Sequence, residues 1–137
     1  MIDNIVINKS EVIARCIGRI REEYGGNAEN LLNMTKQDSI ILNLQRACEA
    51  AIDLAMHIVS ERGYGVPQSS RDAFNLLQKG GVVGEELSAR LKAMVGFRNI
   101  AVHDYQAIQL GILQSIIERH LDDFVEFANL IKQSSRR

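Results

Sequence analysis

The chain has 137 residues, the size of one ordinary domain that can bury a core without disulfides or a structural metal. Hydrophobic residues make up 46% and charged residues 24% of it, and no low-complexity run is present, which argues against disorder. A formal net charge of −1 gives no global positive field for a polyanion. Any nucleic-acid site must therefore come from a local basic patch or from two subunits combined, and we expect a single folded domain over residues 1–137.

The two cysteines, Cys16 and Cys48, occupy apolar helical positions and lack the paired spacing of zinc or redox motifs. Both are expected to be reduced core residues. The first residues, MIDNIVINKSE, contain acidic and polar side chains that interrupt a signal-peptide hydrophobic region, and no apolar run reaches the length of a membrane span. The sequence therefore predicts a cytoplasmic protein with no membrane contact.

Helix is the expected structure of the whole chain, because apolar residues recur at spacings of three and four and no segment shows strand alternation. The first helix is expected at about residues 8–24, where Gly25 and Gly26 end it. A short connector follows it. Three apolar side chains of this connector are expected to plug the core: Leu31, Leu32 and Met34.

The second helix is expected at about residues 36–62, after a capping signal formed by Thr35 and Asp38. Its apolar stripe is rich in small residues, which would let a neighbouring helix approach closely. Pro67, the one proline of the chain, lies in the loop that follows.

A short third helix, DAFNLLQK, begins at the capping-box-like pair Ser69 and Asp72. A fourth helix begins near Gly84, and the last covers about residues 107–132. The expected fold is all-α, an antiparallel helical bundle of about five helices.

The last helix is apolar on more than one narrow stripe. Its bulky residues point to several sides: Leu110, Ile112, Leu113, Ile116 and Ile117. A second buried face is typical of a subunit interface, most simply of a two-fold homodimer. A helix that lies at the centre of its own bundle would show the same pattern, so both interpretations stay open.

Two histidines outside the most polar segment are better explained structurally. His120 has no cooperating polar group in the pattern and is expected to be solvated or half-buried. Glu49, Asp53 and His57 follow one another at spacings of four on the second helix and would line one face. Further nitrogen or sulfur ligands are missing there, so ion pairing is favoured over metal binding and no metal is expected.

The segment FRNIAVHDY, residues 97–105, collects polar groups that helix packing does not require. On a continuous helix Arg98 and His103, five residues apart, would be separated by about 140°, whereas Asn99 and His103 would share a face. Residue types alone favour a capped helix end with solvated side chains over a functional site.

A site in this segment would require the helix to break. If it ended near Ile100 or Ala101 and the next residues were extended or turned, His103 and Tyr105 would point to the same side and Arg98 could fold back toward them. An arginine, a histidine and a phenol would suit cleavage of an RNA phosphodiester by its own 2′-hydroxyl, a reaction that needs neither metal nor cofactor.

The same residues resemble a known family. The Arg, four residues, His, one residue, Tyr pattern of RNIAVHDY is similar to that of the HEPN superfamily, specifically its HepT branch of toxin ribonucleases. Three longer segments also resemble HepT, so the resemblance covers nearly the whole chain: RACEAAIDLAMHIV, VPQSSRDAFNLLQKGGVV and LSARLKAMVGFRNIAVHDY.

The resemblance implies a role for each matching residue. Arg98 would bind or polarise the scissile phosphate, His103 would transfer the proton, and Asn99 would orient the loop or the substrate. Tyr105 matches the tyrosine to which an antitoxin of the minimal nucleotidyltransferase type (MntA) adds AMP. Asp53 is our choice for a carboxylate that orients Arg98 or His57.

The resemblance also implies a homodimer whose two motifs face a shared cleft, with tRNA or mRNA as the substrate. Pooled basic residues would supply the missing positive surface. The candidates are Arg98, Arg90, Lys92, Arg15 and Arg19. The alternative to a ribonuclease toxin is a helical protein without nuclease activity that holds the substrate of a nucleotidyltransferase or regulates that enzyme.

Overall fold

The computed structural model describes residues 3–135, which form helices joined by short loops with no strand among them. The elements in chain order are α1 (Asn4–Tyr24), η1 (Ala28–Leu32), α2 (Met34–Arg62), α3 (Ser70–Lys79), α4 (Glu85–His103), η2 (Tyr105–Ala107), α5 (Leu110–Arg119) and α6 (Leu121–Ser135), where η denotes a 3-10 helix. The all-α prediction is confirmed. None of the helices in this range has both the length and the apolar character needed to cross a membrane.

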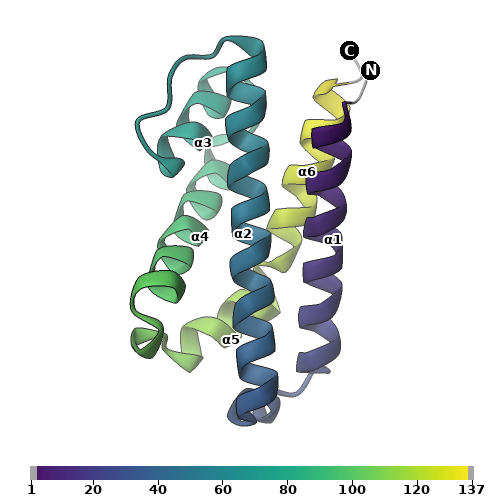
Figure 1. Ribbon diagram of the computed structural model, residues 1–137, viewed down its shortest axis with the longest axis vertical. Helices are drawn as coiled ribbons and strands as arrows, with labels where there is room; N and C mark the ends of the chain where they lie inside the picture. Colours follow the sequence, from purple (N-terminus) through teal and green to yellow (C-terminus); the bar gives the residue numbers. More distant parts are fainter. Residues whose placement is uncertain (1–2, 136–137) are drawn as a thin grey trace.

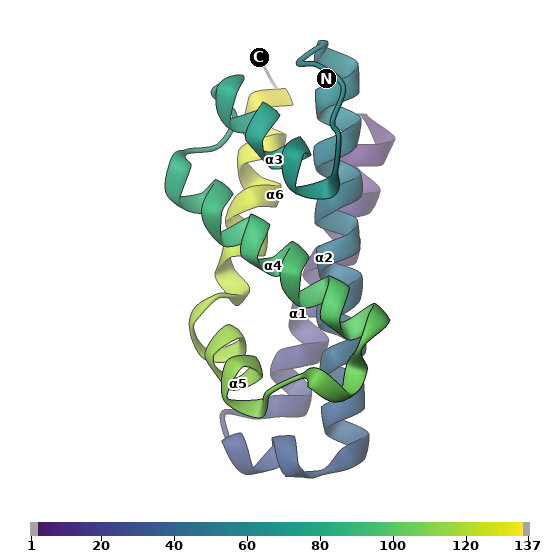
Figure 2. The same ribbon diagram turned by 90° about the vertical axis from the view of Figure 1, so that its left-hand side faces the viewer.

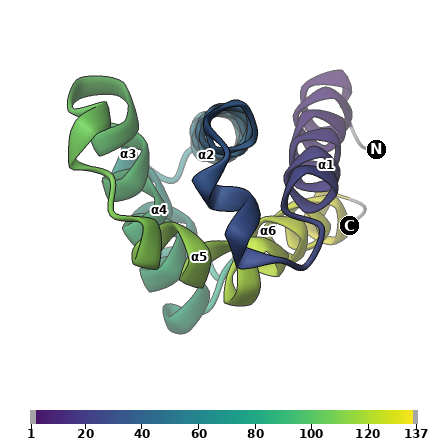
Figure 3. The same ribbon diagram turned by 90° about the horizontal axis from the view of Figure 1, so that it is seen from below.

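Four long helices, α1, α2, α4 and α6, form the body of the bundle. In Figure 1, α1 and α2 run side by side in opposite directions, and α1 begins at the end of the molecule where α6 finishes. Seen from below, α1 and α4 lie on opposite sides of α2 (Figure 3). Figure 2 shows the short helix α3 above α4, with α5 at the lower end. Helix α2 therefore contacts helices from both halves of the chain.

The small residues of α2 allow this close packing. Four alanines on its buried faces are almost inaccessible: Ala47, Ala50, Ala51 and Ala55. Side chains that end at Cβ let neighbouring backbones approach and leave the larger residues of α1 and α4 to fill the space. Cys16 and Cys48 are free and buried, as predicted.

One of the two predicted N-caps is observed, and the other is formed by a different residue. Ser69 caps α3 as expected, because its Oγ accepts a hydrogen bond from the Asp72 N–H at 3.1 Å. The prediction that Thr35 begins α2 is wrong. Asn33 is the N-cap, and its side chain accepts a hydrogen bond from the Lys36 N–H at 3.0 Å. An Asn side chain is a strong N-cap, and the helix begins two residues earlier than expected.

The connector before α2 buries less than predicted. Leu31 is buried in the core, whereas Leu32 is 72% exposed and Met34 is 63% exposed. The 3-10 turn η1 repeats every three residues, so neighbouring side chains point in different directions and one of the three reaches the core. The predicted plug is therefore a single leucine.

The predicted last helix is two helices. His120 has φ −126° and ψ 0°, which ends α5 one residue before α6 begins. The two helices bury apolar residues against the bundle from different directions, while Ile112 of α5 stays 53% exposed. Leu113, Ile116 and Ile117 are buried on α5, and Phe124 and Phe127 are buried on α6, which leaves in another direction (Figure 2).

Phe127 is expected to be a main contributor to stability. It is fully buried, and its ring meets that of Phe74 edge to face, with centroids 5.6 Å apart. Phe127→Ala should lower the free energy of unfolding by about 3–5 kcal/mol because the cavity cannot collapse between α3 and α6. Urea denaturation checks this. Val125→Ala, on the exposed side of the same helix, is the control, with a change within about 0.5 kcal/mol.

Candidate functional site

Helix α4 does not break where a local site would need it to. It continues to His103, and the Asp104 N–H still donates to the Ile100 carbonyl at 2.8 Å. Buried Ala101 anchors this last turn against the bundle. The break suggested near Ile100 or Ala101 is therefore wrong. Because each residue of a helix rotates by about 100°, Arg98 and His103 point about 140° apart within one chain.

Arg98 is held by two neighbours. Its Nε donates to Asn99 Oδ1 at 3.0 Å, and its Nη2 is 3.4 Å from Ser70 Oγ at the start of α3. No carboxylate within residues 3–135 forms an ion pair with Arg98, so its charge is not neutralised in this part of the chain. An oriented guanidinium without an acid partner is suited to bind an anion such as a phosphate. Ser70 lies 28 residues from Arg98 in the chain, and its role was not predicted.

His103 ends α4 and is exposed. Asn99 lies four residues earlier and so on the same side of the helix, as the spacing predicted. An exposed imidazole at a helix end can reach a molecule that lies across this end of the protein. The His103 side chain leaves α4 on a different side than the Arg98 side chain.

Tyr105 lies in η2, shortly after the end of α4, and its hydroxyl bonds to a residue of α2. Its hydroxyl donates a hydrogen bond of 2.5 Å to Asp38 Oδ1. Partial burial, followed by the Asp38 carboxylate, raises the pKa of Tyr105 to about 12. The side chain is therefore a neutral phenol near pH 7, and it remains 40% exposed. Sequence analysis assigned Asp38 to helix capping, because nothing local indicates a partner 67 residues away.

Asp53 does not take the predicted orienting role. Its carboxylate pairs with Lys9 of α1 at 3.0 Å, and it contacts neither Arg98 nor His57. The expected row along α2 is also absent, since His57 turns to other partners and Glu49 accepts from Gln45. Asp53 pairs with α1 and His57 with the α1 N-cap Asp3, partners that a spacing rule within one helix cannot include.

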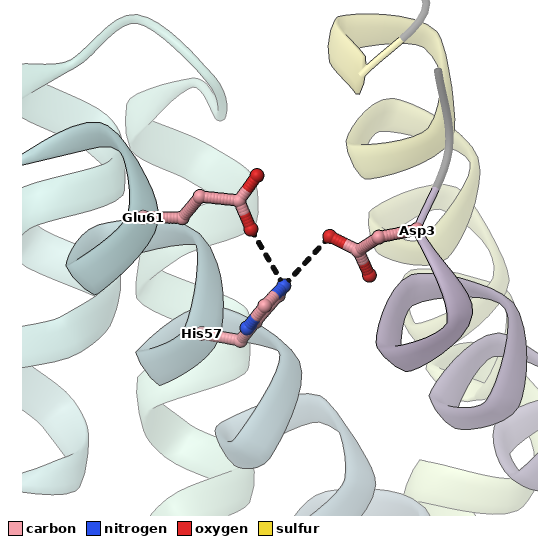
Figure 4. A group of neighbouring side chains, drawn as sticks. All are labelled: Asp3, His57 and Glu61. Atoms are coloured by element: carbon pink, nitrogen blue, oxygen red, sulfur yellow. Dashed lines mark hydrogen bonds and ion pairs between the residues drawn. The ribbon is translucent and has the colours of Figure 1, made fainter.

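His57 connects the C-terminal part of α2 to the N-terminus of α1. Its Nε2 lies 2.8 Å from Asp3 Oδ2 and 2.8 Å from Glu61 Oε2 (Figure 4). Asp3 also caps α1, because its Oδ1 accepts from the Val6 N–H. These three side chains are potential metal ligands by type and proximity. They lie about 28 Å along α2 from Asp38, at 1.5 Å per residue, so they belong to another part of the molecule.

A groove of about 720 Å³ opens between α4 and α5 beside the polar segment. Asn99 and Ile100 line it from α4, and Ile112 and Ile116 line it from α5. Half-buried His120 is at its edge and bonds to Asp123, as expected for a structural histidine. Two of its lining residues are large apolar side chains that are exposed, Ile100 at 42% and Ile112 at 53%, and Val102 of α4 is also exposed, at 47%.

The contribution of Asp3 to stability should depend on pH. The hydrogen bond with His57 holds the pKa of Asp3 at about 2, below the ordinary 3.8. A depressed carboxylate pKa stabilises the fold above the ordinary pKa, and this stabilisation is lost as the pH falls from about 4 to about 2. Asp3→Asn keeps the cap and removes the charge. Thermal melting should give the wild type a higher Tm than Asp3→Asn at pH 5, and most of this difference should be lost near pH 2.

Asp3→Ala is the matched variant, because it removes the cap as well as the charge. It should melt below the wild type at both pH values. A wild-type advantage over Asp3→Asn that is the same at pH 5 and pH 2 would contradict the ion-pair explanation.

Sequence comparison places these features in a family. A family model described as "Ribonuclease HepT-like" matches residues 13–131. The chain is 50% identical over 130 residues to the "mRNA nuclease HepT" of Shewanella oneidensis, with 95% of this chain and 98% of that protein covered. It is 29% identical over 105 residues to the "tRNA nuclease HepT" of Aphanizomenon flos-aquae, with 76% and 71% covered.

Solved structures agree with the sequence match. The fold is similar to that of the tri-AMPylated HEPN toxin of S. oneidensis in complex with MNT antitoxin, with a TM-score of 0.91 and 49% identity over 96% of this chain and 99% of that one. A toxin–antitoxin structure with AMP-PNP matches with the same TM-score, identity and coverage. The chain belongs to the HepT-like ribonuclease family.

Proposed function

We propose that this protein is the toxin of a HEPN/nucleotidyltransferase toxin–antitoxin pair and that it cleaves RNA in the cytoplasm. The observation that carries the proposal is Arg98, a guanidinium oriented by Asn99 and Ser70 and left without an acid partner among residues 3–135. The 50% identity to a protein described as an mRNA nuclease supports it. Two buried free thiols, Cys16 and Cys48, suit a reducing compartment.

The reaction would be attack of the RNA 2′-hydroxyl on the adjacent phosphorus. The new bond forms a cyclic phosphate, and the bond to the 5′-oxygen of the next nucleotide breaks. His103 would accept the 2′-hydroxyl proton or return a proton to the leaving oxygen, and Arg98 would stabilise the negative charge on the phosphate oxygens. No metal is needed for these steps.

A second copy of the chain would complete the site. Arg98 and His103 point to different sides of α4, so one chain does not direct both at one phosphate. A two-fold axis beside α4 would bring the two motifs to a shared cleft. The exposed apolar residues Ile100, Val102 and Ile112 lie next to this segment and supply surface for such a homodimer to bury.

The partner antitoxin would silence the toxin by transferring AMP to Tyr105. A relative of this chain was solved as a tri-AMPylated toxin in complex with MNT antitoxin, which supports this regulation. The Tyr105 hydroxyl is bonded to Asp38, so modification must break that hydrogen bond. A phosphate placed there would face the Asp38 carboxylate and add negative charge beside the motif, which would repel RNA.

Arg98→Ala and His103→Ala should each abolish toxicity. Loss of a positioned proton-transfer group or of an anion-stabilising donor costs about 10²–10⁴-fold in rate. Expression without the antitoxin, followed by growth and RNA-integrity measurements, checks this. Arg119→Ala, an exposed arginine on α5, is the matched control and should stay toxic. Equal behaviour of all variants and the wild type would favour the alternative, a non-catalytic partner of a nucleotidyltransferase.

Tyr105→Phe should prevent modification by the antitoxin. Incubation of the wild type with the antitoxin and ATP is expected to add AMP, seen as a mass increase of the intact protein. The phenylalanine variant has no oxygen to attack the α-phosphate and should keep its original mass. Tyr64→Phe, a half-buried tyrosine before α3, is the control and should still be modified. An adduct that persists on Tyr105→Phe would place the modification on another residue.

A further inference from the structure

A second groove lies on the other side of α2, between α1 and α2. It has a volume of about 530 Å³ and is lined by six residues: Val12, Arg15, Cys16, Arg19, Asn43 and Arg46. Three of the six are exposed arginines in a chain whose net charge is −1. We call it the arginine groove. Figure 3 shows α1 on the opposite side of α2 from α4, the helix on which Arg98 is located.

Among the residues that the structure describes, carboxylates neutralise one of these three arginines. Arg19 pairs with Glu22 and Glu23 of its own helix. Within residues 3–135 neither Arg15 nor Arg46 has a carboxylate partner. Like charges that share a concave surface repel one another, so an arrangement of this kind is stabilised by a bound anion.

Both unpaired arginines line the groove, Arg15 from α1 and Arg46 from α2. Cys16 also lines it, and burial raises the pKa of its thiol, while the positive charges of Arg46 and Arg15 act in the opposite direction. A charge affects a neighbouring group in this way only at short range. The two arginines, one from each helix, therefore concentrate positive potential at one place.

The groove also offers contacts that are not ionic. Asn43 donates its amide N–H to the Ser39 carbonyl at 2.8 Å, which leaves its Oδ1 as an acceptor. Val12 contributes apolar surface beside it. Arginine, amide and apolar surface together suit a nucleotide, in which an anionic phosphate adjoins a sugar and a base.

We propose that the arginine groove binds backbone phosphates of the RNA substrate through Arg15 and Arg46, away from the cleavage site. This inference rests on the proposed ribonuclease function. RNA carries one phosphate per nucleotide, so one strand can supply neighbouring charges to both arginines. An acidic protein surface would need two carboxylates projecting into a concave site, which makes it the less suitable occupant.

The other basic candidates from the sequence do not compete for this role. Arg90 pairs with Asp123 at 3.0 Å, and Lys92 donates to Asn75 at 2.7 Å. The Asp123 carboxylate neutralises Arg90, whereas Lys92 keeps its charge beside the neutral Asn75 but does not line the groove. Phosphate contacts in the groove would therefore depend on Arg15 and Arg46.

The salt dependence of RNA binding tests the groove. Fluorescence anisotropy of a labelled single-stranded RNA, measured in a His103→Ala background to prevent cleavage, gives the binding constant at several salt concentrations. Each phosphate contact in single-stranded nucleic acid contributes about 0.7 to the slope of log K against log salt. Arg15→Ala and Arg46→Ala should each reduce the magnitude of this negative slope by about 0.7, and the double variant should reduce it by about 1.4.

Arg21→Ala is the matched control. Arg21 is an exposed arginine of α1 that pairs with Asp122 at 2.7 Å and does not line the groove, so its removal should leave the slope unchanged. In the cleaving protein, the double variant should lower kcat/KM and keep kcat at saturating RNA, because the groove binds substrate without touching the scissile phosphate.

The outcomes separate this inference from the proposed function. Slopes of the Arg15 and Arg46 variants that equal the slope of Arg21→Ala would overturn the groove, whether or not the protein cleaves RNA. Loss of antitoxin affinity in those variants, with unchanged RNA binding, would also overturn it and assign the surface to the antitoxin. The predicted slopes in a protein that never cleaves RNA would support the groove and reject the nuclease.

Discussion

The burial of α2 between α1 and α4 is the constraint on which the rest of the molecule depends. Small side chains on its faces let two neighbouring helices approach, and its single unbroken course carries groups to distant places. Near the start of α2, Asp38 bonds to Tyr105, and further along Arg46 contributes to the arginine groove. Near the end of α2, His57 bonds to Asp3, the N-cap of α1. A kink in α2 would displace all three, because a rigid helix transmits its position along its length.

The continuity of α2 positions groups that meet partners from other segments, whereas the continuity of α4 keeps two candidate site residues apart. A helix that runs without interruption to His103 directs Arg98 and His103 to sides about 140° apart, and our proposal completes the site with a second chain. Catalysis would then be tied to dimerisation, and a monomer would be inactive without any lid or inhibitor. Modification of Tyr105 would act at the same end of α4, where the chain leaves the helix and contacts Asp38.

The net charge of the chain does not show how positive and negative side chains are arranged on its surface. A net charge of −1 suggested no nucleic-acid field, yet acidic residues are placed where they neutralise particular basic groups: Asp53 pairs with Lys9, Asp122 with Arg21 and Asp123 with Arg90. The arginines left without such partners among residues 3–135 are therefore the informative ones. Potential at a surface depends on these local imbalances, because salt screens contributions from beyond about 10 Å.

The sequence by itself determined the helical class, the buried cysteines, the Ser69 cap and the family, since helical periodicity, capping and motif spacing are local properties. Tertiary structure decided where helices end and which polar groups meet. The expected last helix is divided at His120, and Asn33 is the cap expected of Thr35. The partners of Tyr105, Arg98 and His57 come from segments 67, 28 and 54 residues away. Side chains so distant are brought together only by packing, which spacing along one helix cannot encode.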